Sequence, residues 1–254
     1  YGGEVRFDSC MTDLDVRDGA LAGIWVNQTE YIACETLVLA TGHSARDTFA
    51  MLGKHIHMEP KSFAVGVRIE HPQEMINFSQ YGAADVSSLG AASYKLTHQA
   101  EKGRGVYSFC MCPGGFVVNA SSEKGGLAVN GMSYYDRGGE NANSALLVQI
   151  FPEDFGTDHP LGGMYMQREL EKKAFEMAGG GYKVPAQSGG DFINKNSEPQ
   201  FEHIKTTYKP DITLCDLDRL FPEYMTDAMR EGIVAMGRKI KGFDSPDALL
   251  TAPE

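Results

Sequence analysis

Positive charge is scarce in this sequence. Lys and Arg together number 23 against 34 Asp and Glu, so the formal net charge is -11 at pH 7. Surfaces that bind nucleic acids or anionic membranes are rich in Lys and Arg, and this balance argues against both. No window approaches the ~18 consecutive apolar residues that a membrane-spanning helix needs, and no apolar signal segment is found. We therefore expect a cytoplasmic protein with neither a nucleic-acid nor a membrane partner.

Cysteine is also sparse. The five cysteines are an odd number, and their spacing is not that of a disulfide-stabilised secreted scaffold. Reduced thiols in a cytoplasmic protein are therefore the default expectation. No second pair of ligands follows at a zinc-site spacing, so no metal site is predicted.

Apolar residues make up 42% of the chain and aromatic residues 10%, which is enough for a sizeable core. A length of 254 residues corresponds to one large domain or two modest ones. The chain begins with Tyr1-Gly2-Gly3 rather than with Met, and no helix or strand pattern precedes Glu254. We expect it to be the central part of a longer protein.

The first 52 residues contain two kinds of strand pattern. Residues 4–34 alternate and include the turn dipeptide Asp18-Gly19, which predicts a β-meander with a tight hairpin. The segment 37–40 is continuously apolar, as in a strand that is buried on both faces of a parallel sheet. We expect Thr41–Ser44 to turn from this strand into a short helix over 45–52.

The pattern changes from Lys61 onward. Apolar residues at 63, 65, 67 and 69 alternate with polar or small ones, which predicts a half-buried strand with a solvated polar face. Glycine pairs separate further expected strands at 91–97, 106–111, 116–120, 127–133 and 144–151. The fold class predicted is α+β (mixed α/β), with an antiparallel β-rich domain.

Two helices are predicted in the second half. The apolar stripe of 166–178 ends at three glycines, and that of 222–240 begins with Pro222 and is rich in Met. We interpret the Met-rich stripe as core packing rather than as an adaptable binding face. Residues 183–213 contain three prolines, and we expect a loop with little regular structure there.

Four stretches resemble one family. LVLATGHSARDTF (37–49), KSFAVGVRIEHPQEMIN (61–77), YSFCMCPGGFVVNASSE (107–123) and NGMSYYDRGGENANSALLV (130–148) are similar to bacterial FAD-dependent dehydrogenase-like flavoproteins of the two-dinucleotide-binding type. The resemblance extends from about residue 31 to the end. It implies a remnant edge of a Rossmann-like FAD-binding domain at 1–52, a substrate or cap domain at 53–242, and the start of a return to the FAD-binding domain at 243–254.

The chain departs from an intact flavoprotein in one respect. The G-x-G-x-x-G turn that holds the FAD pyrophosphate is absent, since Gly103-Arg104-Gly105 lacks the third glycine and the preceding apolar strand. We predict the central fragment of an FAD-dependent oxidoreductase that does not hold FAD tightly alone. No second dinucleotide loop is found, so the sequence gives no support for NADH or NADPH. The substrate, a small molecule, and the oligomeric state are not predicted.

The resemblance makes the turn at Ala40, Thr41, Gly42, His43 and Ser44 the candidate cofactor contact. A strand that ends in Ala-Thr-Gly delivers backbone to a ligand without interference from large side chains. The alternative for Ser44 is that it caps the following helix.

Cys110 and Cys112 are the first catalytic candidates. Strand alternation would place both thiols on one face beside a glycine-rich turn, where they could exchange electrons with a flavin. The alternative is that they are small apolar core residues.

Arg68 and His71 are the other catalytic candidates. Arg68 and Glu70 share a strand face and could hold a substrate carboxylate or a flavin edge, or they could form an ordinary solvated ion pair. His71 ends the strand and could act as a general acid or base.

Two further hypotheses compete with the flavoenzyme. The missing phosphate loop suggests a non-enzymatic module that binds a ligand or a protein on a degenerate flavoprotein scaffold. The two cysteines suggest a thiol-redox protein.

Overall fold

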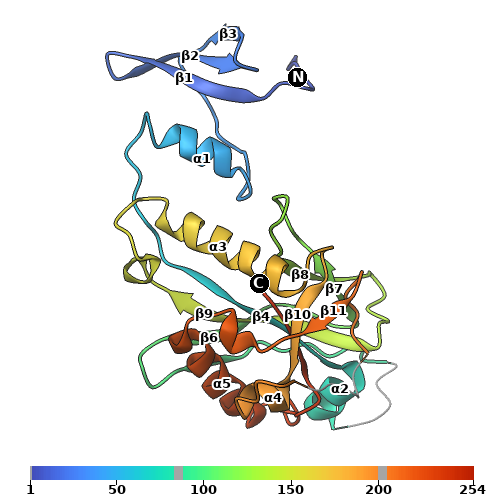
Figure 1. Cartoon of the computed structure of the whole chain (residues 1–254). Coiled ribbons are helices and arrows are strands. Elements are labelled where there is room, and N and C mark those ends of the chain that lie inside the picture. Colours follow the sequence, from blue (N-terminus) through green and yellow to red (C-terminus); the bar gives the residue numbers. More distant parts are fainter. Residues whose placement is uncertain (1, 83–87, 200–204) are drawn as a thin grey trace.

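The structure is a computed structural model that describes residues 2–82, 88–199 and 205–254. Within these ranges the chain forms five α-helices and three sheets, which are mostly antiparallel. The predicted α+β fold class is confirmed. No helix in the described ranges is long and apolar enough to span a membrane. Figure 1 shows a small sheet and α1 on one side of the molecule, and a large sheet flanked by α3 and by α5, α4 and α2.

The small sheet is the predicted β-meander. Strands β1 (Met11–Arg17), β2 (Ala20–Val26) and β3 (Glu30–Ala33) pair antiparallel in that order. Asp18 and Gly19 both have positive φ, 51° and 78°, as a tight turn that matches the twist of two strands requires. The hairpin prediction is confirmed.

The strand predicted at 37–40 does not form in the structure. These residues are in neither a helix nor a strand, and Val38 is 83% exposed. A parallel strand needs a neighbour for its N–H and C=O groups. No described backbone hydrogen bond reaches residues 36–43, because the described part of the chain places no strand beside them.

Helix α1 (Arg46–Leu52) confirms the short helix expected after the turn. Its N-cap residue is Ala45, without a side-chain capping bond, so the capping role considered for Ser44 is wrong. The side chain of Arg46 is only 4% exposed and bonds the carboxylates of Glu123 and of Glu171. Because Glu171 lies on α3 (Gly162–Met177), this buried ion pair joins α1 to the rest of the molecule.

The large sheet has seven strands in the order β11-β10-β12-β4-β9-β6-β5. Its longest strands, β4 (Phe63–Pro72) and β9 (Asn141–Ile150), pair antiparallel over their whole length. Of the strand pairs formed by the described residues in this sheet, that of β10 and β11 alone is parallel. The remaining strands of this sheet are β5 (Thr97–Gln99), β6 (Gly105–Cys112), β10 (Val184–Ser188), β11 (Ile212–Leu214) and β12 (Leu249–Thr251).

A separate hairpin covers part of this sheet. Strands β7 (Gly115–Asn119) and β8 (Val129–Ser133) pair with each other, and Gly131 of β8 packs directly over β4. As a result, β4 is buried on both faces, and Arg68 and Glu70 have no solvent exposure. The solvated polar face expected for this strand is therefore wrong.

Two other expectations fail locally. The segment 183–213 contains β10, the short helix α4 (Gly189–Ile193) and β11, although 200–204 lies outside the described residues. Of the strand expected at 91–97, only residue 97 lies in one, β5. Short strands such as these depend on partners far along the chain, and their few residues give no periodic pattern.

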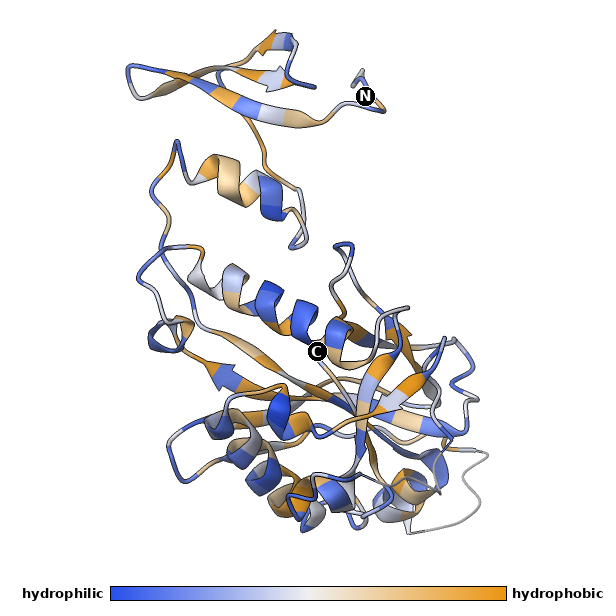
Figure 2. Ribbon diagram, viewed as in Figure 1, coloured by the Kyte–Doolittle hydropathy of each residue, from blue (hydrophilic) through white to orange (hydrophobic). Residues whose placement is uncertain are grey.

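Helix α5 (Glu223–Gly237) packs against the large sheet through its Met-rich stripe. Met225, Met229 and Met236 are fully buried, which confirms that the stripe is core. At Gly232 an added Cβ would lie 2.6 Å from Val106 of β6, so helix and sheet are in close contact there. Burial of each such side chain stabilises the fold by about 1.5–3 kcal/mol. Figure 2 shows hydrophilic and hydrophobic bands along both α5 and α3, as expected for helices with one face on the core.

The other helix described is α2 (Gln73–Tyr81), which follows β4 without a break. Strand β12 lies between β10 and β4, so the last residues of the chain belong to the large sheet. The predicted domain division, with boundaries at 52/53 and 242/243, stays a prediction.

Candidate functional site

A buried cluster surrounds the guanidinium of Arg68. Its Nη1 donates to Glu254 Oε1 at 2.7 Å and its Nε donates to Asn143 Oδ1 at 2.7 Å. Its Nη2 donates to the carbonyl of Cys110 at 2.6 Å and lies 3.2 Å from Cys112 Sγ. Every nitrogen of this guanidinium therefore has a protein partner. Arg68 thus joins three distant segments, and four of its five N–H groups have a partner among the described residues.

The strand register explains how this cluster forms. Arg68 lies opposite Ala145 on β9, so Asn143, two residues away, is on the same face and within reach. Gly131 of β8 lies over both side chains. An added Cβ there would be 2.0 Å from Arg68 Nη2 and 2.3 Å from Asn143 Oδ1. The absence of a side chain at Gly131 is what lets the hairpin close over Arg68.

Glu254 is the acidic member of the cluster. Its backbone exchanges two hydrogen bonds with Gly66 of β4, which holds the carboxyl group beside Arg68. Burial raises the pKa of Glu254 to about 7, an effect that outweighs the opposing attraction of Arg68. Glu254 Oε2 and Asn143 Nδ2 are buried without a partner among the described residues. The cluster thus holds a carboxyl group that can exchange a proton near neutral pH.

The two cysteines do not share a face. A register shift between Phe109 and Cys112, with a φ of 41° at Cys110, interrupts the alternation of β6. Cys110 is exposed, whereas Cys112 is buried beside Arg68. Burial raises the pKa of the Cys112 thiol, and the charge of Arg68 only partly opposes this. The expectation of a common face is wrong, because it assumed a regular strand.

Glu70 does not pair with Arg68. Its carboxylate accepts hydrogen bonds from Asn141 Nδ2, from Thr206 Oγ1, and from both the amide and the hydroxyl of Thr207. The hypothesis of a solvated Arg68–Glu70 ion pair is therefore wrong. The two charged residues of β4 bind different segments of the chain instead.

His71 lies on the face of β4 opposite Arg68. Its Nε2 bonds the carbonyl of Phe243 at 2.8 Å, and its Nδ1 is buried without a partner among the described residues. Burial lowers the pKa of His71 to about 4. This imidazole is neutral at pH 7 and is not brought together with the cysteines. Its role as an acid or base stays a prediction.

The candidate cofactor turn is at the surface. Ala40, Thr41, Gly42, His43 and Ser44 are all exposed, and Gly42 has a φ of 73°. Ser44 Oγ lies 3.4 Å from His43 Nδ1. The structure does not bring these residues into hydrogen-bond contact with the Arg68 cluster. The backbone groups of residues 40–43 have no described backbone hydrogen bond, whereas the carbonyl of Ser44 accepts one from the amide of Arg46 at 2.9 Å.

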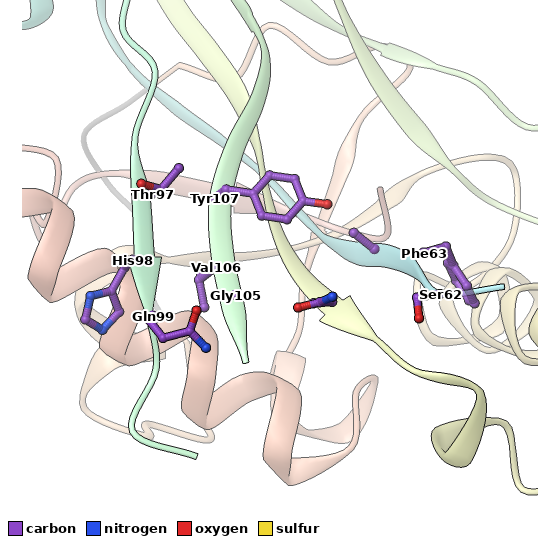
Figure 3. Close-up of a pocket in the computed structure, with 10 residues that line it drawn as sticks. Ser62, Phe63, Thr97, His98, Gln99, Gly105, Val106 and Tyr107 are labelled. Carbon is purple, nitrogen blue, oxygen red and sulfur yellow. The ribbon is translucent and has the colours of Figure 1, made fainter. Parts of the chain in front are cut away.

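A polar hollow of about 520 Å³ lies on the large sheet, at the end remote from Glu70. Figure 3 shows the ring of Tyr107 projecting from β6 toward β9, while His98 of β5 points to α5. His98 pairs there with Glu231 at 2.7 Å, which lowers the pKa of that carboxyl group. None of the residues predicted to form a site lines this hollow.

Sequence reasoning missed two members of the buried cluster. Asn143 and Glu254 were not among the catalytic or cofactor-binding residues predicted from the sequence. Arg68 and Glu254 are separated by 186 positions, and no periodicity or motif connects residues so far apart. Only the pairing of β12 with β4 brings them together.

Residues 62–254 match the model of a family described as FAD-dependent protein, C-terminal domain-like. The chain belongs to this family. An uncharacterized protein of Clostridium beijerinckii is 49% identical over 256 residues, which cover 100% of this chain and 48% of the relative. The chain therefore spans about half the length of that relative.

Proposed function

We propose that this chain is the substrate-facing portion of an FAD-dependent oxidoreductase, which shapes a small-molecule pocket beside the flavin. The observation that carries the proposal is the family match over 62–254. In such enzymes the flavin supplies the electron transfer, and the protein positions and encloses the substrate.

The segment 37–44 supports a contact with FAD. Residues 37–40 are apolar and lie in neither a helix nor a strand, and their backbone groups have no backbone hydrogen-bond partner in the described part of the chain. These are the properties of a strand that completes a parallel sheet supplied by further residues. In a parallel sheet, ligands bind at the carboxyl ends of the strands, which is where Thr41–Ser44 would lie. The backbone N–H groups of this turn would then hold one edge of the cofactor.

The Arg68 cluster supports a positioning role. It fixes the bend at Cys110–Cys112 and the C-terminal residues against β4, with Glu254 as its titratable group. Cys110, whose carbonyl accepts a hydrogen bond from Arg68, is exposed beside this cluster. We assign Arg68 to the positioning of these groups and Cys110 to the substrate-facing surface.

The proposal is tested on the full-length protein that contains this chain. Purified protein should carry a flavin that is bleached by anaerobic dithionite and recovers in air. NADH and NADPH are tested separately as reductants. A Gly42→Val variant should retain at most a tenth of the flavin, whereas Gly19→Ala, in the distant hairpin, should retain all of it. Equal flavin content in both variants would argue against the Thr41–Ser44 contact.

The second candidate is a non-enzymatic module that binds a ligand or a protein. It is favoured by one observation: each nitrogen of the Arg68 guanidinium and each carboxylate oxygen of Glu70 has a protein partner. Both charged side chains of β4 are thus engaged in contacts within the chain. A full-length protein that binds FAD but transfers no electrons to any acceptor would support this candidate over the oxidoreductase.

A further inference from the structure

A second hollow lies on the outer side of the β7–β8 hairpin, away from the Arg68 cluster. Its volume is about 570 Å³, within the range of small-molecule sites. One side is formed by β7 and by residues that follow β8, and the other by the segment 205–209. None of the residues predicted to be catalytic or cofactor-binding lines it.

One wall of this hollow is aromatic. The rings of Phe116 and Tyr134 meet edge to face, with centroids 5.5 Å apart and an interplanar angle of 72°. Val118, two residues after Phe116 on β7, extends the apolar surface. Phe116 and Val118 are half-buried and Tyr134 is 73% exposed, so part of this aromatic surface is open to a ligand. A planar ring is the shape that such a wall stacks against.

The opposite wall is cationic. Lys205 and Lys209 are exposed and line the hollow, and neither ammonium group has an ion-pair partner among the described residues. Among the described residues that line the hollow, Glu140 is the acidic one. In a chain of net charge -11, two unpaired lysines around one cavity form a local positive field that attracts an anion.

Hydrogen bonds that are buried or partly buried connect the two walls. Thr207 Oγ1 accepts from the amide of Val117 and donates to the carboxylate of Glu70, at 2.8 and 2.6 Å. Asn141 Nδ2 donates both to Glu70 and to the carbonyl of Lys205. The segment that carries the lysines is thereby held to β4 and β7. A site whose walls are already in place loses little freedom on binding.

We propose that this hollow binds a planar organic anion. The ring of the ligand lies against Phe116 and Tyr134, and its carboxylate or phosphate lies between the ammonium groups of Lys205 and Lys209. This proposal does not depend on the flavin, because every residue named belongs to the described part of this chain.

The test uses isothermal titration calorimetry on the intact chain with three probes that share one ring: 2-naphthoate, 2-naphthyl phosphate and the neutral 2-naphthylmethanol. At least one of the two anions should bind at least tenfold more tightly than the alcohol. The anion that binds more tightly identifies the headgroup. Equal binding of the alcohol, or no binding of either anion, would overturn the proposal.

Variants assign the site. Lys205→Gln/Lys209→Gln should weaken binding of the preferred anion at least tenfold, and Phe116→Ala should weaken it similarly. The control Lys172→Gln/Lys173→Gln removes the same charge from α3 and should leave affinity unchanged. Loss of affinity in the control equal to that in the test pair would show an effect of net charge alone and would contradict the assignment. Circular dichroism at the titration temperature establishes that each variant is folded.

Discussion

Replacement of Arg68 by methionine is expected to destabilise the fold strongly. The change removes the partner of Glu254 and the donors to Asn143 and to the Cys110 carbonyl, all on the buried face of β4. Loss of one member of a buried ion pair typically costs about 3–5 kcal/mol, since the other charge stays buried without compensation. Domains are stable by only about 5–15 kcal/mol, so this is a large share of the total.

Urea unfolding followed by circular dichroism measures the effect. With a denaturant slope of about 1–3 kcal/mol/M, Arg68→Met should lower the midpoint by at least about 1 M. The matched control is Arg219→Met, at an exposed position, which should change stability by no more than about 0.5 kcal/mol. Arg68→Lys retains the charge but not the forked donors, and should lie between the two.

The pH dependence of this loss follows from Glu254. Its folded-state pKa of about 7 is above the ordinary value for Glu, so the folded state takes up a proton as pH falls through 7. Without Arg68 the folded pKa rises further, because the attraction that opposed burial is gone. The stability difference between wild type and Arg68→Met should therefore grow between pH 6 and 8, by at most about 1.4 kcal/mol per pH unit. Equal midpoints for the Arg68 and Arg219 variants at pH 8 would refute the account of the cluster.

Three further predictions concern the buried imidazole of His71, the close contact at Gly131, and the different exposure of two cysteines. The folded-state pKa of His71 is about 4, below its unfolded value, so stability should be lost as pH falls from 7 to 5, by about 2 kcal/mol; His71→Asn should flatten this loss and His57→Asn should not. Gly131→Ala should cost about 1–3 kcal/mol in urea unfolding, because its Cβ would overlap Arg68. Iodoacetamide labelling with peptide mapping should modify Cys110 at least tenfold faster than Cys112, whose thiol is buried.

Each of these predictions has a result that contradicts it. An unchanged pH profile in His71→Asn would place the titration elsewhere. The control for the glycine variant is Gly138→Ala, where the nearest atom to an added Cβ is 3.3 Å away at the end of the Asp136 side chain. Equal stability of the two glycine variants would show that the hairpin can shift away from Arg68. Labelling of both cysteines at one rate would mean that β6 opens readily at its bend.

Long, regular elements could be predicted from the sequence because their periodicity reports on a single continuous face. This group comprises the β-meander, the helices α3 and α5, and the long strand β4. The exposure of a strand face could not be predicted in the same way. The polar alternation of β4 is real, but its polar face is covered by the β7–β8 hairpin and by residues 205–207. Polar residues are buried there because each one finds a partner from a distant segment.

The segment 37–40 shows that a local pattern can also predict a strand that does not form in the structure. Its apolar composition predicts a strand, and the local pattern is that of a parallel sheet, yet strand formation depends on neighbours. The described part of this chain provides none beside it. Prediction of the candidate site was limited for the same reason, because it also depends on contacts between distant segments. Arg68 was recognised by its residue type, whereas its partner Glu254 depended on tertiary pairing that no local pattern encodes.

The central claim is that this chain works as part of a flavoprotein and does not hold the cofactor tightly by itself. The visible absorption spectrum tests it most directly, measured on the purified full-length protein and on residues 1–254 after incubation with FAD and gel filtration. The account predicts a flavin band near ~450 nm in the full-length protein, with about one FAD per chain, and almost none in residues 1–254. A full-length protein that is colourless and takes up no FAD would contradict the proposal that this chain is part of an FAD-dependent oxidoreductase.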